Sequence, residues 1–189
     1  MMKASGLSNK HTDSSNVNLD NFFVNRWYAN AFTKGLANNP YVEKLTITKG
    51  SLTDDKLKPI LNAIPHNLKY LDISGNPGLS KNIYPLITST LSVKQSLISL
   101  GIEECNLGDH GTEVICNAVA GISKFRELKL SKNRIGNLGA LHIANMLKWN
   151  QNIWVLLLHW NEITSRGGIA IAQALERNEG LAVLDMSYN

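Results

Sequence analysis

Hydrophobic residues recur along this chain in a nine-residue pattern that can be written L-x-x-L-x-L-x-x-N. The clearest copies are FRELKLSKN from Phe125, IWVLLLHWN from Ile153 and LAVLDMSYN from Leu181, and further copies begin at Val42, Leu68 and Leu97. Successive side chains of a strand point to opposite sides, so the apolar residues at the fourth and sixth places share one face. Each copy therefore predicts a short strand, and the copies from Leu97 onward lie 28 residues apart.

Between these strands, apolar residues recur at every fourth position. One unit holds Ile135, Gly139, Ile143 and Leu147; its neighbours hold Leu107, Gly111, Ile115 and Val119, and Ile163, Gly167, Ile171 and Leu175. A spacing of four places side chains on one face of a helix. Each unit is therefore predicted to run strand, loop, helix. The glycines before the helices are expected to serve tight turns, because no GxGxxG or Walker phosphate-binding motif accompanies them.

These repeated residues resemble the leucine-rich repeat family, and the 28-residue length resembles its ribonuclease-inhibitor subtype. That subtype also occurs in Ran GTPase-activating proteins, NOD-like receptors and tropomodulin-like proteins. The resemblance covers residues 42–189, in units that start at 42, 68, 97, 125, 153 and 181, the last one incomplete. It implies an α/β solenoid shaped like a horseshoe, with a parallel β-sheet on the concave face and α-helices on the convex face.

The resemblance also implies a row of hydrogen-bonded asparagines at the ninth place of each unit. This place holds Asn76, Cys105, Asn133, Asn161 and Asn189, and Gly50 in the first unit. Such side chains satisfy backbone groups in a buried turn. Cys105 offers only a weak donor and Gly50 none, so the first unit is expected to be looser.

The two ends of the chain are predicted to differ from the regular repeats. Residues 1–18 read as a disordered polar tail without the apolar stretch of a signal peptide. Tyr28, Phe32 and Leu36, spaced by four, predict a capping helix over residues 19–41 that covers the first strand. The last strand ends at Asn189 with no helix after it, which favours a fragment of a longer array over an end covered by a partner.

Composition says more about the expected cellular location of the chain than about its function. The net charge of +4 is a mild excess without a basic run, and the chain has two cysteines, too few for a disulfide framework. No stretch reaches the length of about 20 apolar residues that a membrane helix needs. We therefore expect a cytoplasmic, intracellular protein that does not contact a membrane.

No catalytic or metal-binding arrangement is evident in the residues. The histidines lack H-x-x-x-H spacing and the cysteines lack C-x-x-C spacing, and adjacent acidic pairs such as Glu103–Glu104 point to opposite faces of a strand. Cys116 and His142 lie beside apolar helix positions and are interpreted as packed residues. We therefore expect no metal, no cofactor and no enzyme activity. Among the arginines at 126, 134 and 166, nothing singles one out for a GTPase-activating role.

The concave face can be listed from the alternation of the strands, and its fifth and sixth units differ from the others. The predicted partner-binding residues are Val155, Leu157, His159, Trp160, Val183, Asp185, Tyr188, Lys129, Lys132 and Glu103. Exposed apolar and aromatic residues of this kind mark contact sites. The alternative is that Trp160 lies flat over the neighbouring turn and that a following segment covers Leu157. Glu103 and Glu104 are expected to pair with Lys129 and Lys132 on the next strand.

These observations predict a protein–protein interaction module, a scaffold, adaptor or recognition domain that binds a protein on its concave face. A nucleic-acid partner is disfavoured because Asp72, Glu103, Glu104, Glu127 and Asp185 line that face. Two alternatives remain: a GTPase-activating protein of the Ran type, and a docking segment of a larger cytoskeletal or sensor assembly. Further repeats or a neighbouring subunit could cover the C-terminal edge.

Overall fold

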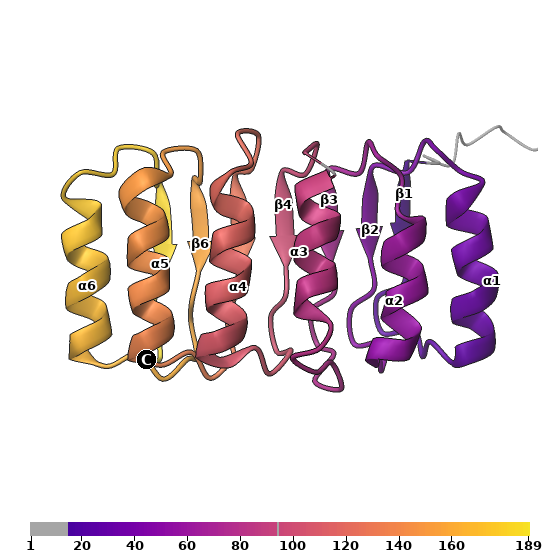
Figure 1. Cartoon of the computed structure of the whole chain (residues 1–189). Helices are drawn as coiled ribbons and strands as arrows, with labels where there is room; N and C mark the ends of the chain where they lie inside the picture. Colours follow the sequence, from indigo (N-terminus) through magenta and orange to yellow (C-terminus); the bar gives the residue numbers. More distant parts are fainter. Residues whose placement is uncertain (1–14, 94) are drawn as a thin grey trace, which may run out of the picture.

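A computed structural model describes residues 15–93 and 95–189, and over these ranges strands and helices alternate along the chain. The strands are β1 (Asn16–Asn18), β2 (Lys44–Thr46), β3 (Tyr70–Asp72), β4 (Ser99–Gly101), β5 (Glu127–Lys129), β6 (Val155–Leu157) and β7 (Val183–Asp185). The helices are α1 (Arg26–Ala37), α2 (Asp54–Ala63), α3 (Tyr84–Val93), α4 (Gly108–Ala120), α5 (Asn137–Trp149) and α6 (Ser165–Leu175). The 7-stranded sheet is parallel and follows chain order. The helices form one layer along one side of the sheet (Figure 1).

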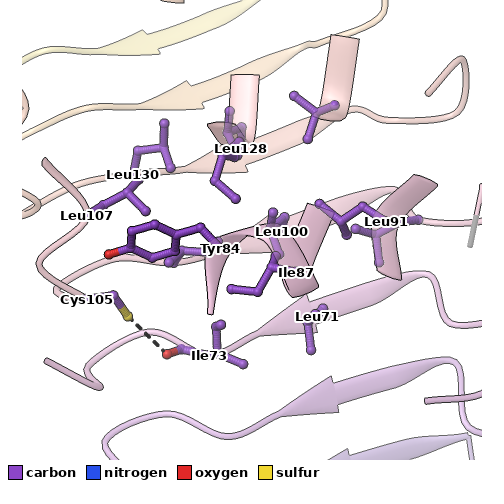
Figure 2. Packing of buried hydrophobic residues seen from close by; sticks show 14 of the residues in the cluster. Leu71, Ile73, Tyr84, Ile87, Leu91, Leu100, Cys105, Leu107, Leu128 and Leu130 are labelled. Carbon is purple, nitrogen blue, oxygen red and sulfur yellow. Dashed lines mark hydrogen bonds between the residues drawn. The ribbon is translucent and has the colours of Figure 1, made fainter. Parts of the chain in front are cut away.

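The core lies between the sheet and the helix layer. Leu71, Leu100 and Leu128 face one another in register across β3, β4 and β5, and all three are buried. Figure 2 shows them with Ile87 and Leu91 of α3, which close the core from the helix side. Truncating a fully buried leucine such as Leu128 to alanine costs about 2–5 kcal/mol, because the lost contacts leave a cavity.

The asparagine row is present in the turns after β3, β5, β6 and β7, at Asn76, Asn133, Asn161 and Asn189. Asn133 Oδ1 accepts the backbone N–H groups of Cys105 (2.9 Å) and Leu107 (3.2 Å) of the preceding unit. Its Nδ2 donates to the carbonyls of Ile102 (2.6 Å) and Leu130 (3.1 Å). One side chain thus satisfies four backbone groups in a turn that water does not reach.

Among the predicted units, Cys105 and Gly50 stand where the row has no asparagine. The Cys105 thiol donates to the carbonyl of Ile73 at 3.3 Å, drawn as the dashed line in Figure 2. Gly50 has no side chain to contribute, and its N–H donates to Asn76 Oδ1 at 3.0 Å. The row therefore reaches the first predicted unit through its neighbour.

A second row of contacts between repeats lies at the helix N-termini. Asp109 Oδ1, from the first turn of α4, accepts the N–H groups of Gly136 (2.7 Å) and Gly139 (2.9 Å) at the start of α5. Asn137 Oδ1 repeats the contact one unit later, with the N–H of Gly167 at 2.8 Å. The N-termini of α5 and α6 are thus each capped by a side chain of the preceding repeat.

This second row corrects the expectation that the repeated glycines serve tight turns. Gly111, Gly139 and Gly167 lie within the first turns of their helices, and their φ angles are not in the left-handed region. A Cβ atom on Gly139 would stand 2.7 Å from Asp109 Oδ1, and one on Gly111 would stand 2.9 Å from the Tyr84 ring. Glycine is required here by close approach, not by backbone conformation.

The N-terminal expectation is wrong for residues 16–18, which form β1 rather than part of a polar tail; residues 1–14 lie outside the described ranges. Val17 and Leu19 alternate with polar residues and pack against the core. Strand β1 pairs in parallel with β2, and the Leu19 N–H donates to the carbonyl of Thr46 at 2.8 Å. The predicted helix over 19–41 is shorter, from Arg26 to Ala37, because residues 19–24 continue the turn that follows β1.

Candidate functional site

Three of the four outward positions of β6 and β7 carry aliphatic side chains, on the face opposite the helices. Val155 and Leu157 are half-buried, whereas the alternate residues Leu156 and Leu158 are buried completely. Val155 lies in register with Val183 of β7, and Leu157 lies in register with Asp185. Val183 keeps 47% of its surface exposed. The aliphatic surface thus continues from one strand to the next.

Two aromatic side chains extend this surface into the turns after β6 and β7. The rings of Trp160 and Tyr188 stack with centroids 4.5 Å apart and planes 12° from parallel. Trp160 therefore does lie against the neighbouring turn, as one sequence alternative held, yet it remains 55% exposed and Tyr188 70%. We call Val155, Leu157, Trp160, Val183 and Tyr188 the β6–β7 patch.

The two aromatic residues stand at a place where the backbone has a left-handed conformation. Trp160 and Tyr188 have φ angles of 56° and 57°, in the left-handed region, as do Lys132 and Glu104 at the same place in the units before. This region costs about 1–2 kcal/mol for a residue with a Cβ atom, and glycine, as at Gly75, adopts it freely. The backbone thus does not favour a large aromatic residue at this place.

His159 links the patch to its neighbours through one ring nitrogen. Its Nδ1 lies 2.8 Å from Ser131 Oγ and 3.2 Å from Asp185 Oδ2. Hydrogen bonds from the backbone and side chain of Ser187, and then the nearby His159, hold the pKa of Asp185 below its ordinary value. In a serine-hydrolase relay the hydroxyl and the carboxylate contact different ring nitrogens. Here they share one, and Ser131 is fully buried, so this trio does not form such a relay.

The charged residues predicted for the site are arranged differently from the expectation. Lys129 Nζ lies 3.6 Å from Glu127 Oε1 on its own strand, and no ion pair joins it to Glu103 within the described residues. Glu103 Oε1 is buried without a hydrogen-bond partner among those residues. The predicted pairing of Glu103 with Lys129 is therefore wrong, because side chains two apart on one strand share a face and reach each other first.

A shallow hollow lies beside the patch, over the turns after β1 to β6. We call it the acidic hollow; it encloses about 300 Å³ and is lined by Asp20, Thr48, Lys49, Asp72, Ser74, Gly75, Glu103, Glu104, Lys132 and His159. The Asp72 side chain, which lines the hollow, packs closely over Gly101, where a Cβ atom would stand 2.6 Å from Asp72 Oδ1. His159 lines the hollow and also adjoins the patch, so the two surfaces are continuous.

The remaining candidates for chemistry are engaged in the structure. Arg126 Nη1 donates to the carbonyls of Ser123 (2.8 Å) and Phe125 (2.9 Å), and its guanidinium lies 5.7 Å from the Trp154 ring centroid. Burial raises the pKa of the Cys116 thiol to about 12.

Over the part of the chain that the structure describes, no group of three or more His, Cys, Asp or Glu side chains could hold a metal ion. Within the same ranges, no helix has the length and apolar character needed to cross a bilayer.

A family model described as "Leucine Rich repeat" matches residues 122–144 and 150–172. These two segments cover the units around α5 and α6, whose strand, loop and helix have the geometry described above. Leucine-rich repeats are thus matched in these two segments of the chain. The parallel sheet, the single helix layer and the asparagine row extend the same repeat geometry beyond the matched segments.

Two curated proteins are similar in sequence to parts of this chain. The Protein Cep78 homolog of Drosophila melanogaster is 33% identical over 82 residues, which is 43% of this chain and 10% of the relative. The NACHT, LRR and PYD domains-containing protein 12 of Mus musculus is 29% identical over 121 residues, 61% of this chain and 11% of the relative. The chain thus spans about a tenth of the length of the curated relatives it matches.

Solved structures share the arrangement of the repeats at low sequence identity. The structure of Leiomodin-1 Actin-Binding Site 2 has a TM-score of 0.61 at 15% identity, covering 88% of this chain and 82% of its own. The tropomodulin C-terminal domain of Caenorhabditis elegans has a TM-score of 0.66 at 12% identity, covering 79% of this chain and 92% of its own. Both similarities concern the leucine-rich repeat fold.

The acidic hollow is the part of the concave face that sequence reasoning missed. The residues at its rim were read one strand at a time, as exposed charges that pair across the sheet. The gathering of these side chains around one hollow depends on side-chain conformation, which the alternation along the strands does not specify.

Proposed function

We propose that this chain is a protein-interaction module of the ribonuclease-inhibitor-like subtype that binds a protein partner on its concave face. The β6–β7 patch is the proposed centre of the contact. The observation that carries the proposal is the continuous apolar and aromatic surface of the patch, in which Trp160, Val183 and Tyr188 are 55%, 47% and 70% exposed. The leucine-rich repeat fold supports the coarser part of the proposal, an interaction module.

Removal of the apolar surface of the patch from water favours the binding of a partner there. Each Å² of apolar surface that a partner removes from water contributes about 25 cal/mol, and Trp and Tyr offer the largest side-chain areas. Residues of these two types supply a large share of interface hot spots, worth about 2 kcal/mol or more each.

The chemistry of the face supports a protein partner over other classes. Acidic and basic side chains alternate around the hollow, so a nucleic-acid backbone would meet carboxylates as well as lysines. The Ser131, His159 and Asp185 contacts share one nitrogen, which supports binding rather than hydrolysis. Because the leiomodin segment with this fold is named as an actin-binding site, purified actin belongs among the partners to assay.

The test compares proteins retained by immobilised variants of the chain, measured by quantitative mass spectrometry. Leu157→Asp and Trp160→Asn alter the patch, and Trp149→Ala is the matched control, because Trp149 is 87% exposed at the end of α5, outside the concave face. We expect a set of proteins retained by the wild type and by the control but lost from both patch variants.

A melting curve separates binding from folding in each variant. Trp160→Asn removes a ring stack worth about 0.5–1.5 kcal/mol. Asparagine is better tolerated than tryptophan in the left-handed backbone at this place, so we expect Tm to change little. An unchanged set of retained proteins in both patch variants would refute the concave-face proposal.

A further inference from the structure

We propose that one edge of the repeat array docks on an anionic membrane surface, through two exposed tryptophans flanked by three basic side chains. These residues, which we call the tryptophan edge, are Lys124, Arg126, Lys148, Trp149 and Trp154. They lie in or beside the loops from α4 to β5 and from α5 to β6, along the upper edge of Figure 1. The inference goes beyond the concave-face function and does not depend on it.

The two tryptophans stand at the two ends of one short loop and face solvent. Trp149 is the last residue of α5 and Trp154 directly precedes β6, with 87% and 57% of their surfaces exposed. The places 28 residues before and after them hold small or charged residues: Gly121 and Arg177 for Trp149, and Arg126 and Ala182 for Trp154. The repeat therefore does not require an aromatic residue at either place, and burial in the core does not account for the pair.

The basic side chains around this pair have no acidic neighbour in their own loops. Residues 114–126 and 137–154 contain no Asp or Glu. Lys124 and Lys148 are exposed, and neither forms an ion pair with another described residue. Their positive charge is therefore available to a partner at this edge.

Arg126 places a further positive charge directly beside one of the rings. Its Nη1 donates to the carbonyls of Ser123 at 2.8 Å and Phe125 at 2.9 Å, which fixes the guanidinium at the edge. The guanidinium carbon lies 5.7 Å from the centroid of the Trp154 ring, a cation–π contact. An aromatic ring and a cation are thus presented together.

The basic surface is confined to these two loops. On one side, the neighbouring loop after α6 carries acidic residues, and its Glu179 N–H donates to Gln151 Oε1 at 2.9 Å. On the other side, Lys69 Nζ pairs with Glu43 Oε1 at 2.8 Å. The tryptophan edge is therefore a bounded patch rather than part of a generally basic surface.

Exposed tryptophan combined with basic side chains is the chemistry that suits a bilayer interface. The tryptophan ring is apolar with one polar N–H, which favours the level of the lipid headgroups. Anionic lipids attract Lys and Arg side chains near the surface. Loops of neighbouring repeats lie about 5 Å apart at the strands and about 8–10 Å apart at the helices, close to the Debye length of about 8 Å, so the charges act on one surface together.

Other classes of partner fit this edge less well. A protein hot spot is enclosed by contacts that exclude water, whereas Trp149 protrudes from the end of a helix, and a fluid lipid surface receives such a side chain without a matching pocket. A nucleic-acid site commonly makes about 6–10 phosphate contacts, more than the cations of this edge supply. The expectation of no membrane contact rested on the lack of a stretch that spans the bilayer, which a surface contact does not need.

The tryptophan edge and the β6–β7 patch lie at different parts of the same repeats. Because the strands are parallel, their N-terminal ends lie along one edge of the sheet, where Trp154 precedes β6. Trp160 and Tyr188 of the patch follow the C-terminal ends of β6 and β7, toward the other edge. A chain docked by the tryptophan edge therefore keeps its patch open to a protein partner.

The test is co-sedimentation of the full chain with vesicles of phosphatidylcholine, with or without phosphatidylserine. We expect binding only where phosphatidylserine is present, and weaker binding as salt is added. Replacing both tryptophans, Trp149→Ala with Trp154→Ala, is expected to lower the partition coefficient more than about tenfold. Lys124→Gln and Lys148→Gln are each expected to lower it about fivefold.

The matched controls stand at the other edge of the array, where the helices begin. Trp27 is 77% exposed in the first turn of α1, and Lys81 is exposed in the turn before α3. Trp27→Ala and Lys81→Gln are expected to bind vesicles like the wild type. Melting curves of all variants are expected to overlay, because the replaced side chains are exposed; if Trp154→Ala lowers Tm, Trp149→Ala alone carries the test.

Two results would overturn the inference. One is that vesicles with phosphatidylserine bind the wild type and the double tryptophan variant equally, or bind neither. The other is that poly-L-glutamate or a single-stranded oligonucleotide binds this edge while vesicles do not, which would assign it to an acidic polymer. The concave-face function is tested separately: Trp160→Asn is expected to keep the vesicles and lose the soluble partners, and Trp149→Ala to do the reverse.

Discussion

Asp109 holds two repeats together, and its replacement by alanine is a quantitative test of how this solenoid is stabilised. Asp109 Oδ1 accepts two backbone N–H groups at the N-terminus of α5, from Gly136 at 2.7 Å and Gly139 at 2.9 Å. Loss of a side-chain cap costs about 0.5–2 kcal/mol. The carboxylate also lies in the first turn of its own helix, α4, where a negative charge contributes about 0.3–1 kcal/mol. Together these effects predict that Asp109→Ala lowers the free energy of unfolding by about 2 kcal/mol.

Urea unfolding followed by circular dichroism measures this quantity. Asp109→Asn keeps an acceptor oxygen but loses the charge, so its loss is expected to be about half that of the alanine variant. Asn137→Ala is the matched variant, because Asn137 Oδ1 makes the same contact with Gly167 of the next unit. If Asp109→Ala unfolds within about 0.5 kcal/mol of the wild type, water replaces the cap at no cost and capping between repeats is not a source of stability.

Two further predictions concern the concave face. Leu156→Ala is expected to cost about 2–5 kcal/mol in urea unfolding and Leu157→Ala less than about 1 kcal/mol, because Leu156 is fully buried and its neighbour only partly; equal losses would contradict the assignment of inward and outward faces. The lowered pKa of Asp185 means that its ionised form stabilises the fold above the ordinary value of 3.8, and that this contribution is lost as pH falls through the folded-state pKa. The stability difference between wild type and Asp185→Asn is therefore expected to narrow between pH 6 and pH 3, and a gap that widens would show the opposite shift.

The inward face could be predicted from the sequence because it obeys a strict rule. Leu128, Leu130, Leu156 and Leu158 occupy the fourth and sixth places of their units, and all four are fully buried. Alternation along a strand allows only one choice of face, and the 28-residue spacing fixes the register between neighbours. The order and pairing of the strands follow from the same spacing.

The first repeat was missed because its first place holds Ser14 and its ninth place Phe22, so both ends of the nine-residue pattern are lost. The inner places do match: Val17, Leu19 and Val24 lie 28 residues before Leu45, Ile47 and Leu52. The signal was therefore present only in the spacing of these three residues. Pairing with the edge of β2 then decides the structure, because that edge offers unsatisfied backbone groups.

The contacts between side chains of different repeats could not be predicted from the sequence, for a different reason. Asp109 with Gly139, and Asn137 with Gly167, recur at one spacing of 30 residues, so the pattern was there to be found. The spacing alone did not indicate a cap between repeats, since a glycine at the start of a helix is equally typical of a tight turn. Likewise, His159 could have contacted Lys132 or Trp160, and the choice of Ser131 and Asp185 depends on the conformation of its ring.

The inward and outward residues of the same repeat contribute differently to the stability of the fold. Inward residues such as Leu156 and the ninth-place Asn161 contact the neighbouring units, and in a solenoid those contacts carry the free energy of folding. Outward residues such as Leu157 and Trp160 contact few groups of their own chain, so they can change with little effect on the fold. The exposed side chains of the β6–β7 patch are therefore expected to contribute little to the stability of the repeats, and they are the ones that we propose a partner contacts.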